Sequence, residues 1–316
     1  MYEQFYDLNH SPFELSPDPH FFYPTACHKE AFANLSYGVL RRKGFVVLTG
    51  EAGTGKTLLL QCLLDFIAQK DVASAFIFNP RLPVLDFLAY VLKDLRLASP
   101  GRTKGEMLGC LSDYLLTRYG RGETTAIIVD EAHLLDWELF QEIRLLTNLE
   151  TAQQKLIQVV LVGQPELDQK LDSLGLRELK QRITLRCRLK PLTFEDFQGY
   201  INRRLELAGA NPHSAFVFDA QAIQMIYDLS HGIPRVINNI CENSLIAGYS
   251  KRIRPITAEV VREVASDLRL SHAAPTVISG NGSKVMATSA QTGSNSLEGV
   301  EILLGDALRR WGVERS

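Results

Sequence analysis

The chain has 316 residues, of which 46% are hydrophobic and 22% charged, a balance typical of a globular protein with a packed core. Its formal net charge of −2 creates no global field that would draw the protein to nucleic acid or to an anionic membrane. Composition alone therefore excludes a strongly basic nucleic-acid binder and favours no particular partner.

The five cysteines are scattered and form no CxxC pair, which argues against a disulfide framework or a zinc site. No stretch approaches the roughly 20 apolar residues of a membrane-spanning helix, and no basic segment followed by an apolar run opens the chain. We therefore expect a soluble, cytoplasmic protein with reduced thiols.

Strand and helix patterns alternate from Phe45 to Leu189. The run FVVLTG at 45–50 is apolar and ends in glycine, as a buried parallel strand does before a loop. Further strands are predicted at 73–79, 125–129 and 157–162, and helices at 56–69, 83–97 and 137–149. This alternation predicts an α/β fold in which a parallel sheet carries helices on both faces.

The strand patterns largely stop after Pro191, and only helical patterns follow. Helices are predicted at 193–207, 219–229, 234–249 and 257–268. The sequence thus divides into an N-terminal segment (1–44), an α/β core (45–190), a small all-helical domain (191–270), a polar linker (271–296) and a short amphipathic tail (297–316). The linker is rich in Ser, Gly, Ala, Thr and Asn, a composition that favours flexibility.

The segment GEAGTGKT at Gly50 to Thr57 matches the pattern GxxxxGK[ST] between a strand and a helix. Its glycines allow backbone N–H groups to face phosphate oxygens, and Lys56 should reach the β- and γ-phosphates. The hydroxyl of Thr57 should bind Mg²⁺. The sequence therefore predicts ATP and Mg²⁺ as ligands, held by Gly50, Glu51, Ala52, Gly53, Thr54, Gly55, Lys56, Thr57 and Leu58.

A pair of carboxylates follows the strand predicted at 125–129. Asp130 stands at the strand's C-terminal end, where it should hold Mg²⁺ together with Thr57. Glu131 comes next and is the candidate general base for an attacking water. With His133 the string spells DEAH, which a group of helicases also uses, but one nucleotide core without a second lobe disfavours a helicase.

Three further polar residues are candidates for sensing or completing the site. Gln164 follows the strand at 157–162, beside the expected γ-phosphate. The segment 177–190 holds six basic residues, which could form a solvated face, a DNA contact or a donor of arginine to a neighbouring subunit's ATP. Arg182 is our candidate for that arginine, with Arg186 next. Arg235, in the string GIPR, opens a helix that could fold back over the phosphates.

Taken together, these motifs closely resemble one AAA+ group, the bacterial general secretion pathway protein A family, also called ExeA-type ATPases. The resemblance covers residues 1–270. It rests on the phosphate loop, Asp130 and Glu131, and on the strings PFELSPDPHFFYP (12–24), YGV (37–39), GQPEL (163–167), QRI (181–183) and GIPR (232–235), with His28 and Glu30.

The resemblance implies an AAA+ P-loop ATPase whose helical domain is a lid and whose subunits form a homo-oligomer through the ATP site. It also implies that Tyr37 and Val39 border the adenine. Longer family members continue into a membrane span and a peptidoglycan-binding module, which this sequence does not show. We therefore expect no direct membrane span. The expected location is the cytoplasm, and peripheral binding to the inner membrane is compatible with it.

The family relation implies ATP hydrolysis that drives or regulates assembly of a secretion, type IV pilus or polysaccharide-export system with membrane-associated partners. Two alternatives stay open. The first is a helper ATPase for DNA transactions of the transposition or replication type, which the basic segment 177–190 would serve. The second is a switch that oligomerises with ATP and scarcely hydrolyses it.

Overall fold

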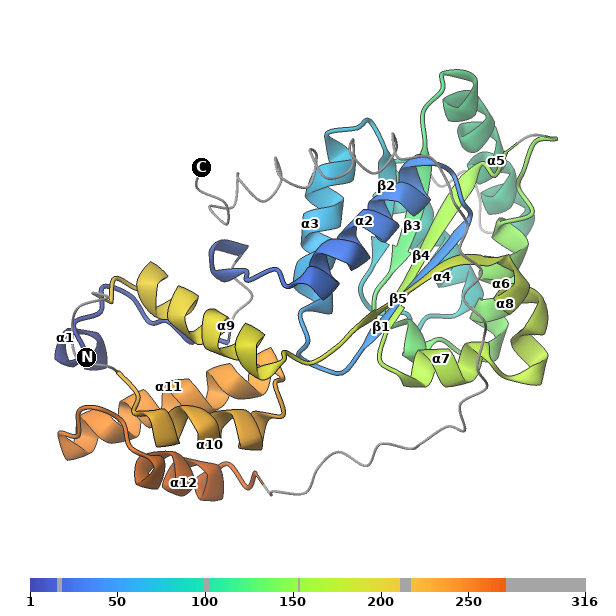
Figure 1. The fold of residues 1–316 in the computed structure, drawn as a ribbon. Coiled ribbons are helices and arrows are strands. Elements are labelled where there is room, and N and C mark those ends of the chain that lie inside the picture. Colours follow the sequence, from blue (N-terminus) through green and yellow to red (C-terminus); the bar gives the residue numbers. More distant parts are fainter. Residues whose placement is uncertain (16–18, 99–102, 153, 211–216, 271–316) are drawn as a thin grey trace, which may run out of the picture. The chain divides into compact units, whose positions relative to one another are not determined.

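The computed structural model describes residues 1–15, 19–98, 103–152, 154–210 and 217–270. The linker and tail predicted at 271–316 lie outside these residues. The described chain forms two compact units (Figure 1). The larger unit runs from Pro24 to Lys190, and the smaller one combines Met1–Tyr23 with the chain from Pro191 onward.

The larger unit is built on a parallel sheet of five strands in the order β2-β3-β4-β1-β5. The strands are β1 (Phe45–Gly50), β2 (Ala73–Ile77), β3 (Thr125–Val129), β4 (Ile157–Gly163) and β5 (Ile183–Leu189). Because all strands run the same way, their carboxyl ends share one edge, where Gly50 pairs with Leu189 and Thr49 with Gly163. The three central strands are buried along their whole length, as their apolar runs predict.

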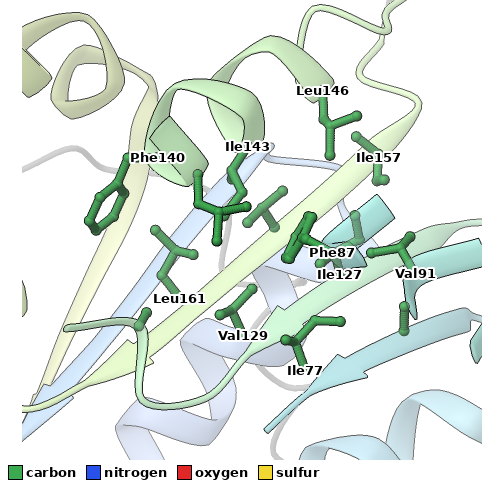
Figure 2. Packing of buried hydrophobic residues seen from close by; sticks show 14 of the residues in the cluster. Ile77, Phe87, Val91, Ile127, Val129, Phe140, Ile143, Leu146, Ile157 and Leu161 are labelled. Atoms are coloured by element: carbon green, nitrogen blue, oxygen red, sulfur yellow. The ribbon is translucent and has the colours of Figure 1, made fainter. Parts of the chain in front are cut away.

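Helices cover both faces of this sheet (Figure 1). One face carries α2 (Ala26–Leu40) and α3 (Lys56–Ala68), which contact each other and β1. The core of the other face includes residues from α4 (Val84–Asp94), α5 (Lys104–Gly120), α6 (Trp137–Leu146), α7 (Glu166–Leu171) and α8 (Arg177–Arg182). Figure 2 shows Phe87 and Val91 of α4 and Phe140 of α6 packed over Ile127 and Leu161 of the sheet. The predicted α/β class is therefore confirmed.

Sequence reasoning assigned no strand to 183–189 and no helix to 104–120. β5 is an edge strand whose outward residues Thr184, Arg186 and Arg188 are exposed, whereas Cys187 and Leu189 are buried. Exposed charge on an edge strand discourages pairing with other chains, and it made this segment resemble a basic surface run. Helix α5 begins with a capping box formed by Thr103 and Glu106.

The smaller unit contains α9 (Phe194–Leu207), α10 (Ala220–Ser230), α11 (Pro234–Lys251) and α12 (Ala258–Asp267), with α1 (Tyr2–Phe5) and a 3₁₀ turn at Pro19–Phe21. Thr193 and Asp219 cap α9 and α10 by accepting backbone N–H groups, as their positions favour. None of the described helices combines the length and apolarity needed to span a bilayer.

The first 23 residues pack with this helical unit, so the expected N-terminal segment 1–44 is divided in the structure at Tyr23. Phe13 is fully buried in the helical core, and Arg204 of α9 donates a hydrogen bond to the carbonyl oxygen of Pro12 at 2.6 Å. The hydroxyl of Tyr2 donates to the Glu242 carboxylate of α11 at 2.7 Å. Burial of these side chains explains why the segment belongs to the helices.

Candidate functional site

The loop between β1 and α3 has the shape of a phosphate cradle. Gly53 and Gly55 adopt φ angles of 83° and 94°, which are open to glycine and strained for other residues. A Cβ atom on Gly50 would lie 3.0 Å from the carbonyl oxygen of Leu189. Glu51 and Ala52 are exposed, Thr54 is buried, and Thr57 and Leu58 lie in the first turn of α3, whose N–H groups lack helical partners.

Lys56 is the cation inside this loop. Its side chain is 6% exposed, and Nζ donates hydrogen bonds to the carbonyl oxygens of Gly50 at 2.8 Å and Glu51 at 2.9 Å. Burial lowers the pKa of Lys56, while the nearby carboxylates of Glu131 and Asp130 act in the opposite direction. A bound polyphosphate would add negative charge beside this ammonium and favour its charged form.

Asp130 and Thr57 meet at the carboxyl edge of the sheet. The Thr57 hydroxyl donates to Oδ2 of Asp130 at 3.3 Å, and Oδ1 of Asp130 accepts the N–H of Glu131 at 2.8 Å. Burial raises the pKa of Asp130 above the ordinary value of an aspartate. A hydroxyl and a carboxylate are the hard oxygen donors that Mg²⁺ takes when phosphates and water complete its shell, so these residues fit that ion.

Glu131 lies at the turn after β3. Its φ of 50° is left-handed, and it precedes a 3₁₀ turn, η2 (Ala132–Leu134). The Oε2 atom of Glu131 is shielded from solvent, makes no hydrogen bond to any described residue, and lies 3.3 Å from Nδ1 of His133. The backbone N–H of Gln164 points to the same His133 nitrogen at 3.4 Å. The structure therefore brings together Glu131 and Gln164, which the sequence placed on separate strands.

His28 is a contact of the loop whose role sequence reasoning missed. It lies in the first turn of α2, is 4% exposed, and places Nε2 3.1 Å from the carbonyl oxygen of Thr54 and Nδ1 2.8 Å from the hydroxyl of Thr25. A Cβ atom on Gly55 would lie 3.2 Å from Nε2. The sequence points to His28 only through the family resemblance, because the contact itself depends on the packing of α2 against the loop.

Tyr37 and Val39 lie toward the end of α2 that is remote from the phosphate loop, and their expected place beside the adenine stays a prediction. Both residues lie near the end of α2, about 14 Å or more along the helix from His28. Val39 is fully buried, and the ammonium of Lys43 lies over the ring of Tyr37 at 5.5 Å. Helix α2 runs toward the amino ends of the strands, away from the loop.

Arg182 lies at the edge of the sheet opposite the phosphate loop. It ends α8 directly before Ile183, which pairs with Phe45 at the amino end of β1. Its Nη1 donates to the side-chain oxygens of Thr147 at 3.1 Å and Asn148 at 2.6 Å. Within one chain, Arg182 is therefore too far along the sheet to touch a nucleotide held at Gly50.

The two remaining arginine candidates have separate environments. Arg186 lies on β5 opposite Val47 and forms ion pairs with Asp168 and Asp172 of the same unit, each at 3.4 Å. Arg235 is exposed in the first turn of α11 in the smaller unit. The predicted contact of Arg235 with phosphates stays a prediction.

Known proteins share this combination of loop, strand ends and helical region. A family model described as an AAA domain matches residues 40–171. General secretion pathway protein A of Aeromonas hydrophila is 42% identical over 252 residues, which cover 79% of this chain. This chain carries an AAA domain. The resemblance to general secretion pathway protein A that the motifs indicated is confirmed, although the chain spans only 45% of that relative's length.

Solved structures share the AAA fold of the chain. Cdc6p from Pyrobaculum aerophilum matches with a TM-score of 0.60 and 20% identity over 79% of this chain and 71% of that one. Drosophila ORC bound to DNA matches with a TM-score of 0.63 and 18% identity over 85% and 66%. At these identities the likeness shows the fold alone. The predicted P-loop architecture followed by a helical region is thus confirmed.

Proposed function

We propose that this AAA protein binds and hydrolyses ATP, and that turnover drives or regulates assembly of a cell-envelope secretion, type IV pilus or polysaccharide-export system. The observation that carries the enzymatic part is the convergence of Lys56, Thr57, Asp130 and Glu131 at one edge of the sheet. A phosphate cradle, a buried ammonium and two carboxylates together provide what phosphoryl transfer to water requires.

In this proposal the loop N–H groups and Lys56 bind and orient the phosphates of the substrate. Thr57 and Asp130 would hold Mg²⁺, which when bound neutralises charge on the β- and γ-phosphates. Glu131 accepts a proton from the water that attacks the γ-phosphorus, while the bond from that phosphorus to the bridging oxygen breaks and ADP departs. Gln164, directly after β4, would sense the γ-phosphate.

We propose that neighbouring subunits cooperate through Arg182. Since it lies at the edge of the sheet opposite the loop, it can serve only the nucleotide of a neighbouring copy. A head-to-tail oligomer would bring this edge of one subunit to the phosphate loop of the next. Arg235 would then act from the helical unit of the nucleotide's own chain, which makes that unit the proposed lid.

The secretion role rests on the relation to general secretion pathway protein A. That relative extends well beyond the part that this chain matches, so partners in the envelope and a cytoplasmic position beside the inner membrane are part of the proposal. The genes adjacent to this one discriminate between the alternatives. Export or pilus genes support the secretion role, and a transposase gene supports the DNA-transaction role.

The structure of the basic segment 177–190 supports DNA binding less than its composition does. Lys180 pairs with Asp172 at 2.9 Å, Arg186 pairs with two aspartates, and Arg182 binds Thr147 and Asn148. Half of the six basic side chains are thus engaged within the unit. Phosphate binding depends on cations that are free to displace counterions, so steeply salt-dependent DNA binding is the result that would restore this alternative.

The ATPase proposal is tested by phosphate release from the purified whole chain with and without Mg²⁺. Lys56→Ala removes the buried ammonium, and we expect it to lower turnover by about a hundredfold or more, since this charge stabilises the transferring phosphoryl group. Equal rates for the wild type and Lys56→Ala would refute hydrolysis. If the wild type nevertheless changed oligomer size with ATP, the switch alternative would take its place.

A further inference from the structure

His133 belongs to the DEAH string, but the proposed mechanism assigns it no role. It lies in η2 between the end of β3 and the start of α6, and its side chain is 11% exposed. Its Nδ1 atom is 3.3 Å from Oε2 of Glu131 and 3.4 Å from the backbone nitrogen of Gln164. One ring nitrogen thus faces both the candidate base and the end of the neighbouring strand.

The contact between His133 and Glu131 matters because of how the Glu131 carboxylate is surrounded. Its Oε2 atom is buried and accepts no hydrogen bond from the described residues, although a shielded carboxylate oxygen is costly to leave without a partner. The backbone of Glu131 is in the left-handed region, and this turn conformation constrains the direction in which the side chain leaves the backbone. When Nδ1 carries the proton, a small rotation of the imidazole or the carboxylate lets His133 donate a hydrogen bond to Oε2 in place of accepting the N–H of Gln164.

The backbone that carries His133 is fixed from two sides. A Cβ atom on Gly163 would lie 3.0 Å from the backbone nitrogen of His133, so η2 packs directly on the end of β4. The ammonium of Lys170 in α7 donates to the carbonyl oxygens of His133 at 2.5 Å and Leu135 at 3.0 Å. These contacts fix the backbone of His133 at the end of β4, from which the ring projects.

We propose that His133 is a positioning residue whose Nδ1–H holds the Glu131 carboxylate and thereby aligns it with the attacking water. This inference rests on the proposed function, because it assumes that Glu131 acts on water. The imidazole does not touch the substrate in this role. With its proton on Nδ1, the imidazole donates to Oε2 of Glu131 and fixes the position of the base, and Nδ1 then no longer accepts the N–H of Gln164.

Three substitutions separate this role from simple packing. His133→Asn keeps a polar atom on Cγ, where Nδ1 stands, so we expect kcat within about threefold of the wild type. His133→Leu removes the polar atom at similar size, and His133→Gln moves it one bond farther out. Both should lower kcat by about ten- to a hundredfold with little change in KM, because misplacing a reacting group by about 1 Å costs that much.

The readouts are steady-state hydrolysis, binding of a fluorescent ATP analogue and the thermal midpoint of each variant. His10→Leu, which removes an exposed histidine of the other unit, controls for loss of a histidine as such. In a Glu131→Gln background, His133→Leu should cause no further loss of kcat, since a residue that acts only through the base has nothing left to position.

Full activity of His133→Leu and His133→Gln in a hydrolysing wild-type background would overturn this inference alone. A further loss on top of Glu131→Gln would do the same, as would equal losses in the Asn and Leu variants. A wild-type chain with no turnover above Lys56→Ala would instead remove the proposed function, and this inference with it.

Discussion

At the scale of single residues, the site keeps opposite charges buried next to one another before any nucleotide is present. Burial lowers the pKa of Lys56 and raises that of Asp130, so each group is displaced toward its neutral form. Phosphates and a divalent ion would reverse both displacements by supplying the missing counter-charges. Glu131 follows Asp130 outside the loop, so in the proposed mechanism it can act on water without contributing to the phosphate cradle.

Glu131→Gln separates nucleotide binding from hydrolysis. The amide keeps the size of the side chain and leaves the loop, Thr57 and Asp130 intact, so we expect ATP affinity within about threefold of the wild type. Hydrolysis should fall by about a hundredfold or more, because an amide cannot accept the proton of water. Equilibrium nucleotide binding and phosphate release measure the two effects. A variant that loses binding and turnover in parallel would contradict the assignment of Glu131 as base.

At the scale of elements, the loop after β1 depends on a close approach of β5. The Cβ that any other residue would bring to position 50 lies 2.9 Å from the hydroxyl of Thr54 and 3.0 Å from the carbonyl oxygen of Leu189. The edge strand therefore supports the cradle from one side, and His28 supports it from α2. Neither support is contiguous in sequence with the loop.

Gly50→Ala should consequently distort the cradle. We expect a loss of about 1–3 kcal/mol in the free energy of unfolding, because the methyl group meets backbone that cannot move freely. ATP affinity should fall by more than the loss of folding stability alone would cause. Gly109→Ala is the matched control: no atom lies within 4 Å of its Cβ position in α5, so it should stabilise the helix by about 0.5–1 kcal/mol. Denaturant unfolding and nucleotide titration compare the two.

At the scale of the whole molecule, the site on one chain is incomplete if Arg182 acts on ATP. Its hydrogen bonds to Thr147 and Asn148 hold it at the edge of the sheet remote from its own loop. If Arg182 acts on a neighbour's ATP, activity depends on the oligomer, and dilution below the dissociation constant of the oligomer would abolish hydrolysis.

Mixing two inactive variants tests this dependence. Arg182→Ala subunits and Glu131→Gln subunits should each be inactive, yet a one-to-one mixture should regain activity at about a quarter of its sites, where an intact Glu131 meets an intact neighbouring Arg182. Phosphate release is measured before and after mixing. A mixture no more active than its components would exclude a shared site, and the thermal midpoint of Arg182→Ala checks that its lost hydrogen bonds do not unfold it.

The sequence by itself determined the features that depend on contiguous residues. The phosphate loop at 50–57, the carboxylates Asp130 and Glu131, and the alternation that indicates a parallel sheet all lie in short segments whose chemistry or periodicity is local. The same locality explains why the family resemblance could be recognised from motifs and was confirmed by a relative at 42% identity.

Only the tertiary structure decided which distant segments meet. It placed β5 at the edge of the sheet, although its charges resemble a surface run, and it grouped residues 1–23 with the helices of the other unit. It also brought His28 to the phosphate loop and His133 to the carboxylate that follows β3. The physical reason is that strand order and helix packing are set by burial between segments far apart in sequence, which no local pattern encodes.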